Sequence, residues 1–370
     1  MIRCNIYKKK FTLTKNNKYI QVSKYRNCFK KMNMRFYNKF LIIAIVALMA
    51  FSCKKEESTI SRPLLGTAVS ITIADDIDRA PLFELAFKEI ERIQSIFNPS
   101  DADSDITKIN SYAFKRPVIV SDECIDILLI ARDVSEKTDG AFDMTFASMA
   151  GLWNLSRDDF IPPSKEKVAE ILQFLSYKNV FVDKQSKSVR LLKEGTKIGF
   201  GGIVKGYASK KAVEVLKSKG VKNCLVACAG DIHVAGTNNG KPWLVGLKDP
   251  RGDSVIATFY MEDGDSVSTS GDYERYKIYN GKRYHHIIDP RTGYPAESGL
   301  VSVTVFSKDP LLTDAYSTAF FVMGRERALT ILKRAPEIAA VLITSDMKVY
   351  VSGSLRDRIH FREDLKIEYF

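Results

Sequence analysis

The segment formed by residues 266–295 constrains the fold of this 370-residue chain more than any other stretch. Two β-like runs, residues 273–279 and 282–288, flank Asn280-Gly281, a dipeptide typical of two-residue hairpin turns. A hairpin pairs its two strands antiparallel, so part of the fold must be antiparallel sheet. Just before the hairpin, Ser268 to Gly271 predict a small polar turn that ends in glycine.

Two adjacent histidines lie at the end of the return strand of this hairpin. His285 and His286 are two of only four histidines in the chain, and Asp289-Pro290 follows them. Neighbouring strand residues face opposite sides of a sheet, so only one of the two can point into a given pocket. Residue chemistry alone leaves two interpretations open: a surface hairpin closed by an Asp-Pro turn, or a hairpin that carries a functional histidine.

The net charge of +12 comes entirely from the first 53 residues, which contain twelve Lys or Arg and no Asp or Glu. The chain has 56 basic and 44 acidic residues, so residues 54–370 carry 44 of each sign. A neutral remainder lacks the basic surface that nucleic-acid binding requires. We therefore expect no nucleic-acid partner.

Residues 34–53 are typical of a lipoprotein signal segment. Arg35 and Lys39 give a positive start, the twelve residues 40–51 are apolar, and Cys53 follows just before a polar stretch. As a helix, such a run reaches about 18 Å, short of the roughly 30 Å hydrocarbon core, which favours a secretory signal over a transmembrane span. With lipidation at Cys53, the protein would be exported and anchored on the periplasmic face of a bacterial membrane. The alternative is an ordinary N-terminal anchor helix.

Three further ranges complete the expected domain organisation. Residues 1–33 precede the signal and predict a non-native N-terminal extension, residues 54–63 predict a polar tether, and residues 64–370 predict one large domain. Helical and strand patterns are mixed in this domain and several hairpins occur, which predicts an α+β fold of mainly antiparallel sheets with packed helices. The expected strands or hairpins are 64–74, 180–192, 223–236, 243–248, 255–260, 300–306, 338–344 and 348–352; the expected helices are 78–97, 121–137, 164–175, one that opens within 197–208 and runs to 219, 312–323 and 325–333.

Three cysteines of this domain are expected in the core. Cys224 and Cys228 lie four residues apart in a strand-like run, which separates them by about 13 Å. That distance excludes a disulfide or a shared zinc ion. Cys124 occupies a position in a helical pattern where a small apolar residue packs well.

A glycine-rich turn, residues 199–206, precedes one of the expected helices. Backbone amides at a helix N-terminus, with no side chains in the way, suit a phosphate or pyrophosphate, and Lys205 adds a positive charge. The spacing is neither GxGxxG nor a Walker loop. The alternative is a tight helix–sheet contact that requires glycine.

Asp314 and Thr318 are four residues apart in an expected helix and therefore share one of its faces. A carboxylate beside a hydroxyl offers hard oxygen ligands for magnesium, which usually keeps water ligands and also binds substrate phosphates. The alternative is an N-terminal aspartate favoured by the helix dipole, with the threonine bonded back to a carbonyl.

Eight motifs in this order make the chain resemble the ApbE family of FAD:protein FMN transferases. They are Leu65-Gly66-Thr67, SIFNPSDADSDITKIN (95–110), Gly140-Ala141-Phe142-Asp143, GFGGIVKGYA (199–208), Cys228-Ala229-Gly230-Asp231, TSGDYERY (269–276), HIIDPRTG (286–293) and TDAYSTA (313–319). The resemblance covers about residues 60–355. It also accounts for the signal segment, because members of this family are commonly exported and lipid-anchored.

The resemblance implies a magnesium-dependent reaction in which FAD is the substrate. FMN would be attached through its phosphate to a Thr or Ser hydroxyl of an acceptor protein, a flavin-bearing subunit of a membrane redox complex, and AMP would be released. His286 matches the histidine of the family's motif, and we expect it to act as the general base with a pKa near 6.5. The implied magnesium ligands are Asp314, Thr318 and the backbone carbonyl of Gly202. The implied flavin-binding residues are Leu65, Asn98, Ala141, Phe142, Asp143, Gly199, Lys205 and Ile288.

The chain departs from the family's pattern in three places. Gly199 stands where an aspartate usually opens the turn, the loop before residue 103 is longer, and CAGD replaces the commoner AGGD. Other activities also stay open: an FAD pyrophosphatase that releases FMN and AMP, a non-catalytic flavin-binding lipoprotein, or the older assignment to thiamine biosynthesis.

Overall fold

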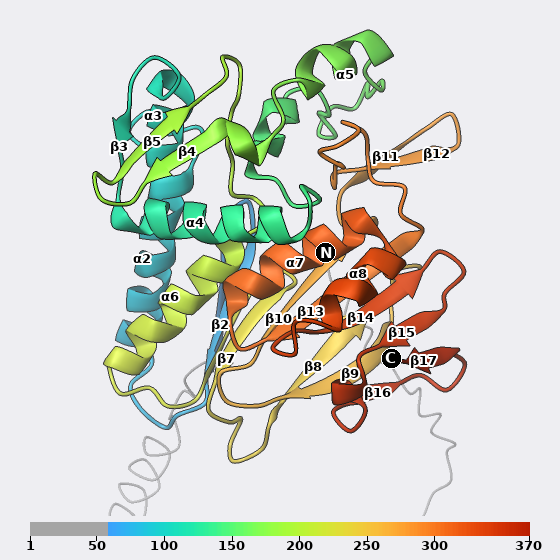
Figure 1. Cartoon of the computed structure of the whole chain (residues 1–370). Helices are drawn as coiled ribbons and strands as arrows, with labels where there is room; N and C mark the ends of the chain where they lie inside the picture. The colour runs from blue at the N-terminus through green and yellow to red at the C-terminus, as the bar shows by residue number, and fades with distance from the viewer. Residues whose placement is uncertain (1–57) are drawn as a thin grey trace, which may run out of the picture. The chain divides into compact units, whose positions relative to one another are not determined.

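The computed structural model describes residues 58–370, shown in colour in Figure 1. The expected N-terminal extension, the signal segment with Cys53, and residues 54–57 of the expected tether lie outside the described residues. Within residues 58–370, no helix combines the length and apolarity needed to cross a bilayer.

A nine-stranded sheet forms the centre of this domain. Neighbouring strands follow the order β1-β2-β6-β7-β10-β13-β14-β15-β17, and every pair is antiparallel except β15 and β17. The strands are β1 (Thr59–Leu64), β2 (Thr67–Ile73), β6 (Cys224–Cys228), β7 (Asp231–Ala235), β10 (Ser266–Gly271), β13 (Leu300–Ser307), β14 (Ala339–Thr344), β15 (Val349–Val351) and β17 (Ile367–Tyr369). The mainly antiparallel pairing confirms the expected α+β class.

Helices cover one face of this sheet and a smaller sheet covers the other. Helix α6 (Val204–Ser218) packs on β6 and β7 between α2 (Ala80–Phe97) and α7 (Pro310–Met323), and α7 packs on β10 and β13 (Figure 1). On β14, Leu342 belongs to the core beneath the helices, whereas its neighbour Val341 belongs to the core beneath the smaller sheet. This alternation is the period of two expected for a strand buried on both faces. The smaller sheet consists of β16 (Ile359–Phe361), β9 (Val255–Met261) and β8 (Trp243–Lys248), and α8 (Arg325–Leu332) follows α7 over β14.

A second group of elements packs above the N-terminal end of α6. The three-stranded sheet β3-β5-β4 contacts α3 and α4, and α4 also contacts α7. The predicted hairpin forms a separate two-stranded sheet, in which Asn280 and Gly281 both have positive φ angles, 49° and 75°. Its Tyr284 ring stacks on Trp153 at 5.9 Å. The elements are α3 (Asp105–Tyr112), β3 (Val118–Ile119), α4 (Asp122–Lys137), η1 (Met144–Met149), α5 (Lys165–Leu172), η2 (Tyr177–Asn179), β4 (Val180–Asp183), β5 (Ser188–Leu191), β11 (Tyr276–Tyr279), β12 (Lys282–His285) and η3 (Gly353–Leu355).

The helix boundaries follow from capping residues in the sequence. Ser121 accepts a hydrogen bond from the amide of Cys124 and begins α4, and Ser164 caps α5 in the same way. Asp309 caps α7, whose first residue is a proline. Such caps satisfy amides that have no partner within the helix. The predicted bounds of α4 and α7 are confirmed to within about two residues, as are those of α2 and α8, whose N-termini have no side-chain cap.

Two local predictions were wrong. Residues 64–74 form no single strand, because Leu65 and Gly66 have φ angles of 54° and 69° and turn the chain between β1 and β2. Residues 59–63 of the expected tether consequently lie in β1, at the edge of the central sheet. Residues 268–271, expected as a turn, lie in β10, where serines at alternate positions face the buried helix α7.

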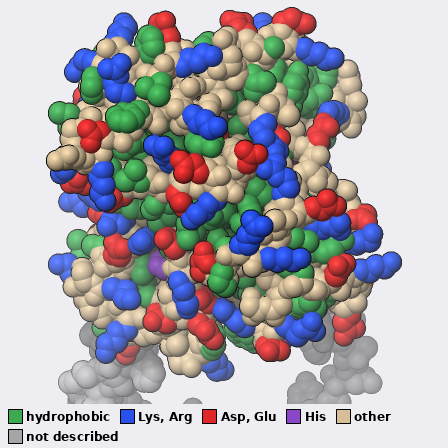
Figure 2. All heavy atoms as spheres, in the orientation of Figure 1, with side chains coloured by type: hydrophobic (Ala, Val, Ile, Leu, Met, Phe, Trp, Pro, Cys, Tyr) green, Lys and Arg blue, Asp and Glu red, His purple; other side chains and the backbone are tan. Residues whose placement is uncertain are grey.

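The charged surface and the cysteines agree with expectation. Figure 2 shows basic and acidic side chains interspersed over one face, as their equal numbers in residues 54–370 imply. Cys124, Cys224 and Cys228 are buried and free. Burial raises the pKa of each thiol, so these are packing residues rather than reactive ones.

Candidate active site

The candidate site lies where the N-terminal end of α6 meets the first turns of α7. Gly206 is the contact residue: a Cβ there would lie 2.0 Å from the carbonyl oxygen of Pro310. The close approach lets the Gly206 amide donate a 3.0 Å hydrogen bond to Oδ2 of Asp314. Gly206 is therefore required for tight packing, but against helix α7 rather than against the sheet as the alternative had it, and that packing fixes one carboxylate oxygen of Asp314.

Asp314 is part of a buried cluster of three charges. Its side chain is 2% exposed, and Asp231, at the start of β7, is 3% exposed. The Lys205 ammonium hydrogen-bonds Asp231 and lies 3.3 Å from Oδ1 of Asp314. Burial alone would lower the pKa of Lys205, but the charges of Asp231 and Asp314 outweigh it and raise this pKa. Burial, and then the charge of Asp231, raise the pKa of Asp314. With all three groups ionised, the cluster carries a net charge of −1.

Thr318 lies one turn beyond Asp314 on α7, on the same side of the helix. A Cβ on Gly202 would lie 3.5 Å from the Thr318 hydroxyl, so this glycine and this hydroxyl face each other. Ser270 of β10 lies 3.3 Å from the same hydroxyl and 2.8 Å from that of Ser317. The alternative of an N-terminal aspartate with a back-bonded threonine is wrong, because the first turn of α7 contains no acidic residue and it is Ser317 that bonds back to the carbonyl of Asp314.

These residues fit a hard cation. One carboxylate, one hydroxyl and a backbone carbonyl form an oxygen-only ligand set that leaves positions for water and substrate. Residues 58–370 contain no group of three His, Cys, Asp or Glu side chains able to hold a metal ion. A cation at this site would therefore depend on Thr318 and on the backbone of Gly202 in addition to Asp314.

The loop before η1 places Phe142 over the glycine-rich turn. A Cβ on Gly202 would lie 3.2 Å from the Phe142 ring, and Gly199 donates its amide to the carbonyl of Met144 at 2.9 Å. The carboxylate of Asp143 accepts hydrogen bonds from the amides of Thr145 and Tyr177. Burial raises its pKa, and these hydrogen bonds oppose the rise. Asp143 is thus engaged in shaping the loop, which also contains Ala141, a buried residue.

The two adjacent histidines have different surroundings. His285 is buried, its Nε2 lies 3.1 Å from the carbonyl of Ala296, and its ring packs edge-on against Phe321. His286 is half-buried, and its Nδ1 lies 3.3 Å from the carbonyl of Arg275. Since a carbonyl can only accept, Nδ1 carries the proton and Nε2 keeps its lone pair.

The pKa of His286 differs from expectation. Burial, and then the positive charge of Arg275, lower it to about 4, with smaller contributions from His285 and Lys205. The value near 6.5 that the residue type suggests is therefore wrong for the ligand-free protein. The imidazole is therefore neutral at pH 7.

Three other predicted residues make their contacts in other parts of the domain. Leu65 donates its amide to the side chain of Gln94 at 2.6 Å, one turn before Asn98, the C-cap of α2. The side chain of Asn98 accepts from the amide of Ser100 at 3.0 Å. Ile288 packs with Tyr284 and Trp153 in a separate apolar cluster.

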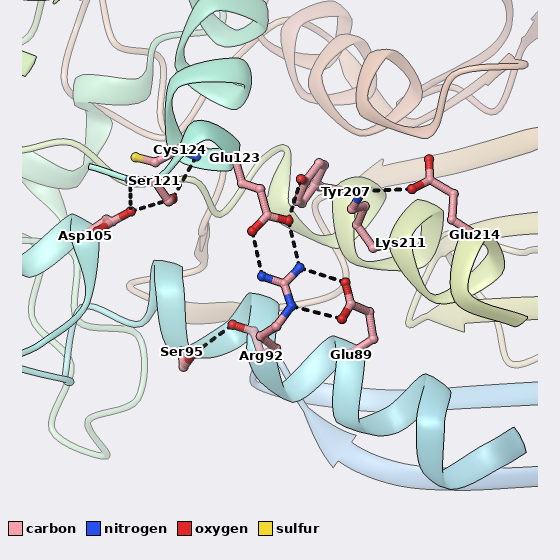
Figure 3. A network of polar contacts seen from close by, with 10 residues as sticks. All are labelled: Glu89, Arg92, Ser95, Asp105, Ser121, Glu123, Cys124, Tyr207, Lys211 and Glu214. Carbon is pink, nitrogen blue, oxygen red and sulfur yellow. Dashed lines mark hydrogen bonds and ion pairs between the residues drawn. The ribbon is translucent and has the colours of Figure 1, made fainter. Parts of the chain in front are cut away.

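An ion network holds α2 against α4 and α6 beside the site (Figure 3). Arg92 of α2 bonds Glu89 on its own helix and both oxygens of Glu123 on α4, at 2.6 and 2.7 Å. Tyr207 of α6 donates to Glu123 at 2.9 Å. The Tyr207 ring also meets Phe97 edge-on, and Phe97 meets Phe200 of the glycine-rich turn. The network thus fixes the turn that contains Gly199 and Gly202.

A cavity of about 460 Å³ lies between β12 and the end of α7. None of the predicted site residues lines it. Its walls are Lys282, Tyr284, Asp289, Arg291, Thr292, Tyr294, Pro295, Glu297, Ser298, Val322 and Met323.

Sequence reasoning missed two contributors to the site. Asp231 was part of the CAGD motif but received no role, because its burial and its pairing with Lys205 are not visible in the sequence. Helix α3 was not expected, and the side chain of its Asn110 brackets Ile198 with two hydrogen bonds, at 2.8 and 3.0 Å, at the start of the glycine-rich turn.

Comparison with known proteins agrees with the sequence motifs. Residues 65–342 match the model of the ApbE family. An FAD:protein FMN transferase of Klebsiella pneumoniae is 32% identical over 274 residues, covering 74% of this chain and 85% of the relative. One of Treponema pallidum is 30% identical and covers 75% and 80%. The crystal structure of the ApbE protein of Thermotoga maritima superimposes with a TM-score of 0.76 at 36% identity, covering 82% of this chain and 99% of that one.

Proposed function

The chain belongs to the ApbE family, and from this premise we propose that it is a magnesium-dependent FAD:protein FMN transferase. The observation that carries the proposal is the cluster of Lys205, Asp231 and Asp314 beside Gly202 and Thr318. Moving a phosphoryl-linked group requires positive charge around the phosphates and a fixed nucleophile.

Each part of the site has a role in this reaction. Lys205 and the amides of the glycine-rich turn would bind the pyrophosphate of FAD. Asp314, Thr318 and the carbonyl of Gly202 would hold magnesium, which when bound neutralises charge that develops on the phosphate oxygens. Leu65, Asn98, Phe142 and Ile288 are proposed flavin contacts.

His286 is the proposed general base. The hydroxyl oxygen of an acceptor Thr or Ser attacks the phosphorus of the FMN half, the bond to the AMP oxygen breaks, and the hydroxyl proton passes to His286. Because Nδ1 is held by the carbonyl of Arg275, Nε2 is the atom that receives it. Its neutral state at pH 7 suits this role.

The location of the reaction is a further part of the proposal. The apolar run 40–51 followed by Cys53 supports export and lipid anchoring on a bacterial membrane. The acceptor would then be a flavin-bearing subunit of a membrane redox complex. These assignments depend on residues outside the described domain.

One assay tests the activity. The purified full-length chain is incubated with FAD, magnesium and a candidate acceptor, and the products are separated by denaturing electrophoresis. A fluorescent flavin band at the acceptor's mass, with release of AMP, is the expected result. Free FMN and AMP without labelled acceptor would instead identify an FAD pyrophosphatase, and unchanged FAD would identify a flavin-binding protein without catalysis.

A further inference from the structure

Asp231 has no role in the reaction as described, yet its carboxylate is one of the least accessible charges of the domain. It is 3% exposed and has Lys205 as its ion-pair partner. Lys205 in turn is shared with Asp314, 3.3 Å away, and its closer contact is with Asp231. The lysine therefore has a choice of two carboxylates, and the structure places it nearer to the one outside the proposed ligand set.

Asp231 and Lys205 differ in how firmly they are held in place. Asp231 begins β7 directly after a tight turn, paired in the sheet with Cys228 on one side and Ser268 on the other. Lys205 lies in the first turn of α6, and its ammonium group is at the end of a long flexible side chain. Sheet pairing holds the backbone of Asp231 and the Gly206 amide holds Asp314, so the lysine side chain is the member of the cluster that adjusts most readily.

The position of this ammonium determines what Asp314 can bind. One oxygen of Asp314 already accepts the amide of Gly206, so its capacity for a cation depends on the other oxygen, the one facing Lys205. If the ammonium moved fully onto that oxygen, a positive charge would occupy the place of a metal ligand contact. Like charges at such short range in a buried site repel strongly.

We propose that Asp231 is a positioning residue that holds the Lys205 ammonium away from Asp314 and so keeps Asp314 available to a divalent cation. The inference rests on the proposed function only in taking Asp314 as a metal ligand. It adds a residue that acts on the metal through lysine, without contact between Asp231 and the cation.

The test measures divalent-cation affinity in the full-length chain without FAD, so that transferase activity plays no part. Mn²⁺ is titrated and its free fraction followed by electron paramagnetic resonance, with Mg²⁺ as competitor. Asp231→Asn should weaken Mn²⁺ binding about tenfold or more, because Lys205 then pairs with Asp314. Lys205→Met should tighten it, because the competing ammonium is gone.

The double variant separates this role from direct ligation. In the Lys205→Met background, Asp231→Asn should cost less than about threefold, the residual effect of one lost negative charge. An equal loss in both backgrounds would make Asp231 a ligand itself and overturn the proposal. So would unchanged affinity in Asp231→Asn.

Two controls address misfolding and the general effect of removing a buried carboxylate. Asp265→Asn removes another buried, ion-paired carboxylate, bonded to Lys308 and Arg358, and should leave Mn²⁺ affinity unchanged. If Asp231→Asn does not fold, Lys205→Met alone decides, since unchanged or weaker Mn²⁺ binding in it refutes the proposal. Absence of FMN transfer by the wild type would refute the proposed function and leave these affinities interpretable.

Discussion

Replacing Gly206 with alanine gives the sharpest test of how the site is built. The new Cβ would lie 2.0 Å from the carbonyl oxygen of Pro310 and 3.2 Å from Cβ of Asp314. Real Cβ atoms essentially never approach within 3.0 Å of another heavy atom, so α6 and α7 would have to separate by about 1 Å. That movement would stretch the 3.0 Å hydrogen bond from Gly206 to Asp314.

Three contributions set the size of the effect. Overpacking a well-packed contact costs about 1–3 kcal/mol. Loss of a buried hydrogen bond to a charged acceptor costs about 1.5–3 kcal/mol. Against this, alanine in place of glycine in a helix gains about 1 kcal/mol. We therefore expect Gly206→Ala to lower the free energy of unfolding by about 1.5–5 kcal/mol.

Urea unfolding of the FAD-free protein measures this change as a lower midpoint at unchanged slope. The matched control is Gly201→Ala, in the same turn, where a Cβ would meet only the Phe146 ring at 3.5 Å. Its unfolding free energy should change by less than about 0.5 kcal/mol. Equal stability of Gly206→Ala and the wild type would refute the close helix contact and, with it, the account of how Asp314 is fixed.

Four further predictions follow from the candidate site and from the predicted signal segment. Asp314→Ala should abolish the magnesium dependence of FMN transfer while the domain stays folded by circular dichroism; an unchanged magnesium titration would place the metal elsewhere. His286→Ala should slow single-turnover AMP release by about 10²- to 10⁴-fold with FAD affinity retained, and His285→Ala far less; normal transfer at saturating FAD would make His286 a binding residue. Proton NMR of the FAD-free protein should titrate His286 with a midpoint near pH 4, the neutral form prevailing above it; a midpoint near 6.5 contradicts the burial. Cys53→Ala should abolish incorporation of labelled fatty acid in a bacterial host, and equal labelling would end the anchor hypothesis.

The parts of the fold that the sequence predicts are those coded by local physics. Asn280-Gly281 requires positive φ at both positions, so the hairpin was readable directly. The expected start of α4 at residue 121 agrees with its Ser121 cap, whereas α7 was expected from residue 312 and begins two residues earlier, at Pro310. The prediction of a turn at residues 268–271 was wrong because Ser, Thr and Gly are typical of turns. Their strand conformation is set by partners on both sides, β7 and β13, which no local pattern contains.

In the candidate site, too, local patterns predict some features and tertiary packing sets the others. Asp314 and Thr318 were predicted as a pair, because a separation of four in a helix fixes a shared face. Lys205, Asp231 and Asp314 come from three elements up to 109 residues apart in the chain. Only the packing of α6 against α7 and β7 brings their charges together. The Arg92–Glu123 bridge is likewise a product of tertiary packing, since the two residues lie 31 positions apart on different helices, whereas only the Arg92–Glu89 pair is local.

The pKa of His286 shows what remains beyond sequence even when the residue is identified correctly. Its type fixes a reference near 6.5, but burial and the charge of Arg275 lower the value to about 4. A base this weak is a poor proton acceptor by itself, and Brønsted behaviour favours a pKa nearer the working pH. The anionic pyrophosphate of FAD, bound at Lys205, would offset the positive charges that now act on the imidazole and raise its pKa. The histidine would then gain basicity when substrate is in place, so its strength as a base depends on the charges gathered around it as well as on its position in the motif.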